Sequence, residues 1–244
     1  MNKEEYEIMY RLEDTHWWYV GMRRIVHRVL RGHLSRQREL RILDAGCGTG
    51  GMMENLGIYG AVVGIDASPE AVGFCCDRGL RQLAQASVTD LPFDDASFDL
   101  VVSFDVLYHR AVLDDGRALE EFHRVLKPNG HVLLRLPAFD WLRGRHDEAV
   151  HTRQRYRARE IDRKLAQAGF RVEKVTYANT ILFPLAVAKR ACEMAFRISG
   201  GSDVKPTSPM MNRLLTGVLG VEAEVIGRAR LPWGLSVLAL AERG

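Results

Sequence analysis

The fold is decided by the stretch Ile42-Leu43-Asp44-Ala45-Gly46-Cys47-Gly48-Thr49-Gly50-Gly51. Glycine lets the backbone turn tightly where a side chain would clash, so that a ligand can lie directly against the main chain. The apolar residues before the turn predict the end of a buried parallel strand, and residues 52–56 after it predict the first turns of a helix. A strand, a glycine turn and a helix N-terminus together predict a nucleotide-binding site of the doubly wound α/β class.

Two kinds of ligand suit this turn. Gly46, Gly48 and Gly51 satisfy the dinucleotide pattern G-x-G-x-x-G. The same turn satisfies D-x-G-x-G-x-G if Gly50 is the third glycine and Asp44 is the acid. A carboxylate so close to the first glycine repels a pyrophosphate and attracts a positively charged ligand. S-adenosylmethionine carries a sulfonium and an ammonium group and no phosphate, so the acid favours this cofactor over a dinucleotide.

At this turn the chain resembles the first motif of the class I S-adenosylmethionine-dependent methyltransferases. The family's D-L-P-F, F-D-x-V and D-V-L-x-H patterns are similar to Asp90-Leu91-Pro92-Phe93, Phe98-Asp99-Leu100-Val101 and Asp105-Val106-Leu107-Tyr108-His109. The resemblance implies that Asp90 binds the adenine amino group, that Leu91 adds a backbone donor, and that Phe104 lies beside the methionine part of the cofactor. It also implies that S-adenosylhomocysteine is the product.

A second apolar strand is predicted for residues 61–66 and ends in Asp66. A carboxylate at this place accepts two hydrogen bonds from a ribose diol, in dinucleotide sites and adenosylmethionine sites alike. We therefore expect Asp66 and the adjacent Ala67 to contact the ribose, the alternative for Asp66 being a cap at the strand end. Ser68 and Pro69 predict the start of the next helix.

The resemblance continues loosely to the C-terminus and implies a doubly wound, Rossmann-like, seven-stranded sheet whose seventh strand is antiparallel. We expect one methyltransferase domain over residues 1–244. Residues 1–40 form a helical cover, residues 41–179 and 230–244 form the core, and residues 180–229 form a helical insertion between strands six and seven. The fifth strand is expected to follow a helix ending at Lys127 and a Pro-Asn-Gly turn.

The two added segments are expected to select the acceptor. In the cover, Trp18 is a candidate wall of the cofactor pocket and Arg23 a candidate partner of the methionine carboxylate, packing against the sheet being the alternative. For the insertion, which includes a Gly- and Pro-rich loop at 200–209, four roles stay open: a lid over an apolar acceptor, a dimer contact, a surface that approaches lipid, or core packing.

Methyl transfer to a hydroxyl group requires that a proton be removed, and histidine is the natural base at neutral pH. His109 and His151 both fall near the expected mouth of the site, and we predict them as catalytic candidates. Asp147 and His151 have the i, i+4 spacing that would place them on one helix face, where Glu148 could join them in holding a divalent cation. Two carboxylates and one imidazole are not specific, so no metal is predicted.

Composition bounds the rest of the prediction. The formal net charge of +3, the absence of a recognition motif and the lack of an Asn/Asp-Pro-Pro-Tyr pattern argue against a nucleic-acid target. Basic residues crowd positions 143–171, which indicates either a solvated helix surface or a site for an anionic group on the acceptor. The four cysteines form no metal pattern, and neither a secretory nor a membrane-spanning segment is evident, so we expect a cytoplasmic protein.

The leading hypothesis is transfer of a methyl group to a small-molecule acceptor, most readily at an oxygen of a hydroxyl or carboxylate group. N-methylation of a small metabolite, and methylation of a lipid-linked or membrane-proximal anionic acceptor, are the alternatives within this chemistry. A non-catalytic adenosylmethionine-binding subunit and a dinucleotide-dependent oxidoreductase are alternatives from other classes.

Overall fold

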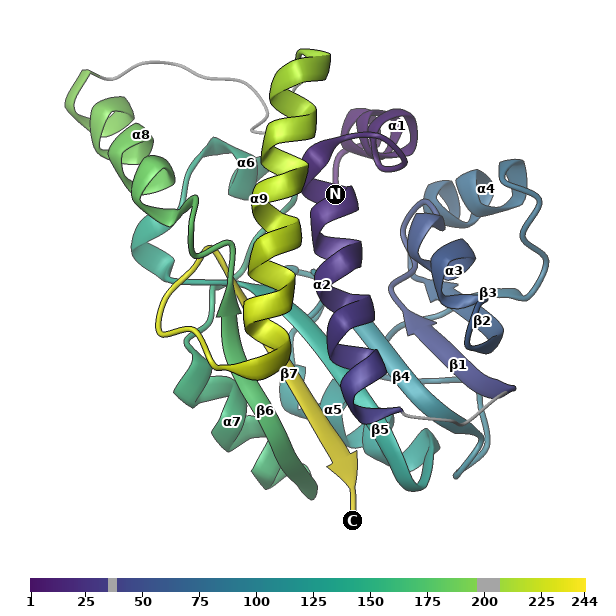
Figure 1. Ribbon diagram of the computed structural model, residues 1–244. Helices are drawn as coiled ribbons and strands as arrows, with labels where there is room; N and C mark the ends of the chain where they lie inside the picture. Colours follow the sequence, from purple (N-terminus) through teal and green to yellow (C-terminus); the bar gives the residue numbers. More distant parts are fainter. Residues whose placement is uncertain (35–38, 197–206) are drawn as a thin grey trace.

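The computed structural model describes residues 1–34, 39–196 and 207–244 and shows one mixed sheet flanked by helices (Figure 1). The strands are β1 (Leu40–Ala45), β2 (Gly60–Asp66), β3 (Leu83–Gln85), β4 (Phe98–Phe104), β5 (Leu126–Pro137), β6 (Phe170–Ala178) and β7 (Ser236–Arg243). Their spatial order is β3-β2-β1-β4-β5-β7-β6. β7 pairs antiparallel with β5 and β6, while the other neighbouring strands pair parallel. The predicted seven-stranded sheet with an antiparallel seventh strand is confirmed.

Helices cover both faces of the sheet. They are α1 (Lys3–Leu12), α2 (Trp17–His33), α3 (Gly51–Leu56), α4 (Pro69–Asp77), α5 (Asp115–Val125), α6 (Arg145–Ala149), α7 (Ala158–Gln167), α8 (Phe183–Phe196) and α9 (Pro209–Arg228), with a 3-10 turn at Asp140–Leu142. α2 and α9 bury their apolar sides on one face, and α5 and α7 bury theirs on the other. β1 and β4 are buried between these layers, so their carboxyl ends form a fixed floor for the site.

The start of β5 differs from the prediction. α5 ends at Val125 and not at Lys127, and β5 begins at once with Leu126. The Pro-Asn-Gly turn lies inside the strand as a bulge, because Phe98 pairs with Leu126 whereas Leu100 pairs with His131. Asn129 turns the bulge with a φ of 63°, a conformation that Asn tolerates better than most residues.

The insertion between β6 and β7 contains α8 and α9, and residues 200–206 of its predicted loop lie outside the described residues. α9 packs along α2, and Gly21 makes this approach close, since a Cβ there would lie 2.3 Å from the Leu219 side chain. α8 extends away from the body of the molecule (Figure 1). Among the helices that the structure describes, none is both long enough and apolar enough to span a bilayer.

A buried tyrosine holds the chain that follows β4. The Tyr156 hydroxyl donates to the Asp115 carboxylate at 2.7 Å and lies 3.0 Å from the Leu107 carbonyl oxygen. Lys164 donates to the other oxygen of Asp115 at 2.8 Å, and these contacts keep the pKa of Asp115 below its ordinary value despite its burial. The loop that carries His109 is therefore anchored to α5 and α7.

Replacing Tyr156 by phenylalanine is expected to lower the free energy of unfolding by about 1–2 kcal/mol, because the hydrogen bond to a charged carboxylate is lost inside the core. Urea denaturation followed by circular dichroism measures this change. A variant as stable as the parent would show that the hydroxyl does not anchor the loop.

Candidate active site

The predicted glycine turn connects β1 to α3. Gly46, Gly48 and Gly50 have φ values of 92°, 54° and 87°, a left-handed region that other residues rarely adopt. At Gly46 a side chain is excluded twice, since a Cβ there would also lie 2.2 Å from the Val106 side chain at the end of β4. The turn therefore presents bare backbone at the carboxyl edge of the sheet, where ligands of doubly wound folds bind.

Asp66, at the end of β2, is tied to the glycine turn. Its carboxylate accepts hydrogen bonds from the backbone amides of Gly48 at 3.0 Å and Ser68 at 2.9 Å. Burial nevertheless raises the pKa of Asp66 above its ordinary value. Each carboxylate oxygen retains a further lone pair, so the group can still accept hydrogen bonds from a diol.

Asp44, at the end of β1, is a buried acid. Its side chain is only 2% exposed, and no hydrogen-bond partner for Oδ2 occurs among the residues that the structure describes. Burial, the largest cause, together with the charges of Asp66 and Glu13 raises its pKa to about 7. Arg135 opposes this rise and does not cancel it. The edge of the sheet thus concentrates negative charge that a cationic ligand would neutralise.

Glu13 is the third acid and belongs to the linker between α1 and α2. It contacts the hydroxyl of Thr49 in the glycine turn and accepts from Arg78 at 2.8 Å, yet burial still raises its pKa. Arg78, which follows α4, also donates to the Thr49 carbonyl at 2.7 Å and pairs with Asp14 at 3.1 Å. This buried cation fastens the α1–α2 linker to the glycine turn, and nothing in its local sequence distinguishes it.

α1 covers the turn (Figure 1). The Met9 side chain lies over Gly48, where a Cβ would approach the Met9 methyl to 2.8 Å. Tyr6 is buried nearby, and burial together with the charge of Asp66 raises its pKa to about 12. The sequence analysis expected a helical cover but did not single out Tyr6 or Met9; their spacing on one face of α1 is the signal that was available.

The residues expected around adenine and ribose lie on the same edge, with one correction. Asp90 and Ala67 are exposed, and Ala67 offers its carbonyl oxygen to Gln85 at 3.2 Å. The Leu91 amide, however, donates to the buried carboxylate of Glu121 at 2.9 Å. The predicted role of Leu91 as a backbone donor to adenine is therefore wrong for this structure, because that donor is already used.

Arg135 is a functional candidate that the sequence analysis missed. Its guanidinium lies over the rings of Trp18 at 4.9 Å and Phe104 at 5.2 Å and pairs with Asp105 at 2.6 Å. Asp105 itself has a φ of 59° just after β4. A single arginine within the apolar run of β5 was the signal that could have revealed this cluster.

Arg23 does not join that cluster. Its guanidinium pairs with the Asp14 carboxylate at 3.6 Å and donates to the Asp14 carbonyl at 3.2 Å. Trp18, by contrast, is half-buried and lies beside Arg135 and Phe104. Pairing of Arg23 with a cofactor carboxylate stays a prediction.

The structure brings His109 and His151 together. Their ring centroids are 5.6 Å apart, and the Met1 amino group lies 3.0 Å from His109 Nε2 and 3.4 Å from His151 Nδ1. The Ala111 amide donates to His109 Nδ1, which leaves the His109 proton on Nε2. His151 Nε2 lies 3.0 Å from the Asn2 side-chain oxygen and donates to it, which leaves the lone pair on Nδ1. Burial lowers the pKa of His109 to about 4 and also lowers that of His151.

The expected helix face shared by Asp147 and His151 is wrong. α6 ends at Ala149, and His151 has a φ of 54°, so the two residues do not lie on one helix. Asp147 is held instead by Arg155, whose guanidinium donates to both carboxylate oxygens at 2.8 and 2.9 Å. Among the described residues, possible metal ligands converge at His131, Glu173 and Glu242. This group lies away from the edge that carries the histidine pair.

A cavity of about 350 Å³ lies beside the histidine pair. It is lined by Arg110, Arg143, Gly144, Asp147, Glu148 and Thr152. The Arg110 amide donates to the His151 carbonyl at 2.9 Å, so the cavity and the histidines share one backbone segment. Of the basic stretch predicted at 143–171, Arg143 reaches this cavity and also pairs with Asp140 at 3.0 Å, whereas Arg155 and Lys164 are engaged with buried acids.

Comparison with known proteins indicates the family. Residues 43–134, which begin in β1 and end in β5, match the family model described as a methyltransferase domain. A Mycolicibacterium smegmatis protein named as a probable S-adenosylmethionine-dependent methyltransferase is 32% identical over 175 residues, 66% of this chain and 62% of the relative. Residues 43–134 are a methyltransferase domain, and the chain is similar to S-adenosylmethionine-dependent methyltransferases.

Other methyltransferases agree with this placement. A demethylmenaquinone methyltransferase of Chlorobaculum tepidum is 35% identical over 121 residues, 48% of this chain and 47% of that protein. The fold matches the methyltransferase solved in complex with the Haloferax volcanii Trm112 activator, with a TM-score of 0.62 and 21% identity, over 99% of this chain and 93% of that chain. The matched part of the chain spans 45–62% of the length of four curated relatives.

Proposed function

We propose that this methyltransferase transfers the methyl group of S-adenosylmethionine to a small acceptor molecule, most readily at oxygen. The observation that carries the proposal is Asp44, a buried carboxylate without a hydrogen-bond partner for Oδ2 among the described residues, close to the charges of Asp66 and Glu13. Negative charge in this place disfavours pyrophosphate and favours a sulfonium and ammonium compound.

The remaining contacts follow from the geometry of the edge. The exposed glycine turn and Asp44 suit the amino acid part of the cofactor, Asp66 suits the ribose hydroxyls, and Asp90 suits the adenine amino group. Phe104 and Trp18 lie on either side of the Arg135 guanidinium and flank the space where β4 ends. We propose Arg135 as a second candidate for the role predicted for Arg23, because its guanidinium contacts Asp105 and Phe104 where β4 ends.

The protein must align the acceptor with the methyl group and, for a hydroxyl acceptor, remove its proton. In the transfer, the acceptor oxygen forms a bond to the methyl carbon while the carbon–sulfur bond breaks and its electron pair stays on sulfur, giving S-adenosylhomocysteine. A hydroxyl acceptor must also lose its proton, and we propose His151 Nδ1 as the base; its lone pair faces the Met1 amino group at 3.4 Å in this structure, so the acceptor would displace that group. His109 Nε2 lies 3.0 Å from the same amino group and would hold the acceptor oxygen after the same displacement.

The cavity beside the histidines suits an acceptor that carries an anionic group. Arg110 and Arg143 contribute two guanidinium groups to its lining, and guanidinium groups bind carboxylates and phosphates in a bidentate manner. N-methylation of a metabolite with the same anionic group is the second candidate, because a neutral amine needs the same alignment. We further propose that residues 1–244 act as one domain in the cytoplasm, where the four free cysteines would stay reduced.

Isothermal titration calorimetry with S-adenosylhomocysteine and NADH tests the cofactor, and turnover with a library of hydroxyl, carboxylate and amine acceptors tests the reaction. We expect S-adenosylhomocysteine to bind and NADH not to bind. Binding of NADH without binding of S-adenosylhomocysteine would overturn the proposal. Binding of S-adenosylhomocysteine without turnover of any acceptor would identify a non-catalytic subunit.

The two histidines are expected to contribute unequally with a hydroxyl acceptor. His151→Gln should lower kcat about 100-fold because the general base is lost, whereas His109→Gln should lower it less. In the parent protein the rate should fall as pH drops through the His151 pKa, with a midpoint below 6.5, since only the neutral imidazole accepts a proton. Carboxylate acceptors need no base and serve as the control. Full activity of both variants with a hydroxyl acceptor would show that catalysis rests on proximity alone.

A further inference from the structure

Exposed large apolar side chains are concentrated on the insertion. Eleven such side chains are exposed among the described residues, and eight of them fall between positions 181 and 233. These are Ile181, Leu185, Met210, Met211, Leu214, Val221, Val225 and Trp233. Single exposed apolar residues are common on protein surfaces, but a larger group gathered on one segment indicates an interaction surface. We call these eight residues the insertion face.

α9 carries one stripe of this face. Its buried residues Leu219, Ala223 and Ile226 pack towards α2 and the sheet. Met210, Leu214, Val221 and Val225 follow each other at intervals of four and seven residues, so they form a second apolar stripe on a different side of the helix. Intramolecular packing therefore accounts for one side of α9, and the other side is exposed in the part of the chain that the structure describes.

α8 extends the face away from the body of the molecule. The helix is largely apolar, Leu185 is exposed, and the helix projects outward from the end of β6 (Figure 1). At its start, Phe183 packs against the ring of Trp141 with centroids 6.1 Å apart, and Trp141 is itself half-exposed. Together with Trp233, this places large aromatic rings at the edge of an apolar surface, where they are enriched at membrane–water interfaces.

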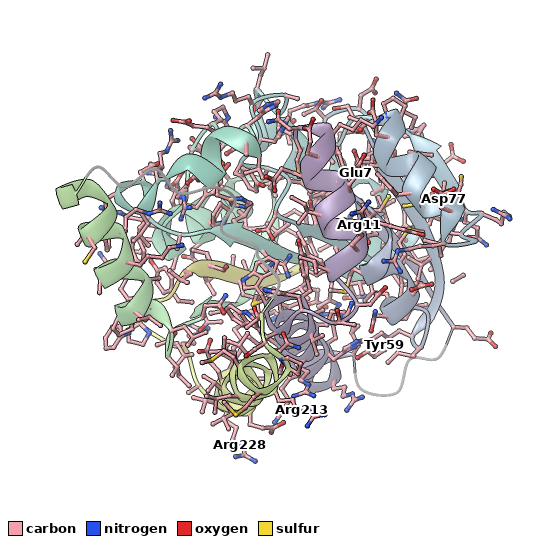
Figure 2. All side chains as sticks on the ribbon, turned by 90° about the horizontal axis from the view of Figure 1, so that it is seen from above. Glu7, Arg11, Tyr59, Asp77, Arg213 and Arg228 are labelled. Atoms are coloured by element: carbon pink, nitrogen blue, oxygen red, sulfur yellow. The ribbon has the colours of Figure 1, made fainter. Side chains whose placement is uncertain are left out.

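The charges that border the face are positive. Arg213 and Arg228 are exposed on α9, and Figure 2 shows both near the outer side of that helix. Among the described side chains of the insertion, the exposed acid is Glu224, and it is neutralised by Arg28 at 3.1 Å. A helix with an apolar stripe and a basic border has the character of helices that lie in the interface of anionic membranes.

We propose that the insertion face docks on an anionic lipid surface, with α9 lying in the plane of the interface. Arg213 and Arg228 favour an anionic lipid surface over a second copy of the chain, because Glu224, the exposed acid among the described side chains of the insertion, is already paired with Arg28. The proposal goes beyond the proposed function and does not depend on it, since lipid binding is measured without cofactor or acceptor.

Sedimentation of the full chain with vesicles tests the proposal. Vesicles of phosphatidylcholine alone are compared with vesicles in which a quarter of the lipid is phosphatidylglycerol, a fraction set by the experimenter at roughly that of an anionic membrane leaflet. We expect binding to the anionic vesicles to be at least about tenfold stronger and to weaken at high salt. Equal binding to both vesicles, or no binding to either, would overturn the proposal.

Paired variants localise the binding. Leu214→Ser with Val221→Ser removes two side chains of the stripe that are 61% and 62% exposed, and Arg213→Glu with Arg228→Glu reverses two border charges. Each pair is expected to lower the affinity for anionic vesicles by about tenfold or more. The matched control is Ile58→Ser with Leu113→Ser, which are 67% and 82% exposed outside the face, and it should bind like the parent.

Two further measurements keep the result unambiguous. Thermal unfolding shows whether the stripe variants remain folded, and Met210→Ser, near the start of α9, provides a milder change if they do not. Analytical ultracentrifugation without vesicles shows whether the face joins two copies. A parent dimer that the stripe variants convert to monomer would overturn lipid docking, as would a control pair that loses binding as strongly as the stripe pair.

Discussion

Asp44→Asn is expected to weaken binding of S-adenosylmethionine by about 100-fold or more. Removing one charge of a buried pair typically costs about 3–5 kcal/mol, because the remaining charge is left buried without compensation. An asparagine fills nearly the same volume, so the loss would report charge and not shape. Isothermal titration calorimetry of parent and variant measures the change in Kd.

The same variant is expected to be more stable than the parent when no cofactor is bound. Burial raises the pKa of Asp44 from 3.8 to about 7, so the carboxyl holds its proton more tightly in the folded state than in the unfolded one. Its contribution to stability is therefore complete below about pH 4 and is lost as the pH rises through about 7. The difference in Tm between pH 5 and pH 8, measured by thermal unfolding, should be smaller for Asp44→Asn than for the parent.

Loss of affinity together with gain of stability is the signature of an acid kept for its ligand. If Asp44→Asn bound S-adenosylmethionine as tightly as the parent does, Asp44 would not contact the positively charged part of the cofactor. If it were less stable at pH 8, the carboxylate would have a stabilising partner in the folded protein.

Asp66→Ala is expected to raise the Kd for S-adenosylhomocysteine by about 100-fold. The ribose hydroxyls would lose their charged acceptor, and hydrogen bonds to charged groups are worth about 1.5–3 kcal/mol each. The amides of Gly48 and Ser68 would lose their acceptor as well, which loosens the glycine turn. Titration calorimetry measures both the affinity and the enthalpy of binding.

Asp77→Ala is the matched control, because Asp77 is an exposed acid at the end of α4, on the outside of the molecule (Figure 2). It should leave the Kd unchanged. An unchanged Kd for Asp66→Ala would contradict the ribose assignment. An equal loss in both variants would show that the effect comes from net charge and not from the site.

The local sequence pattern was sufficient to predict β1, β2, the start of α4 and the glycine turn. The apolar runs that end in Asp44 and Asp66 become β1 and β2, and Ser68 and Pro69 begin α4 as predicted. These features depend on neighbouring residues, whose spacing is visible along the chain. The end of α5 was missed by two residues because a bulge in β5, set by pairing with β4, overrode the turn signal.

Contacts between distant residues decided how the site is built. The Leu91 amide is taken by Glu121, and the Arg135 guanidinium is placed between Trp18 and Phe104, although no local pattern links these positions. His109 and His151 were both predicted as catalytic candidates. The loop after α6 places His151 beside His109 and not beside Asp147. The sequence by itself determined the strands that end in Asp44 and Asp66 and the acidic glycine turn, because they follow from short-range periodicity and backbone sterics, whereas the seven-stranded sheet was implied by the family resemblance. The tertiary structure decided which side chains share the site, because burial and charge at one edge arise only when separate strands and helices are packed together.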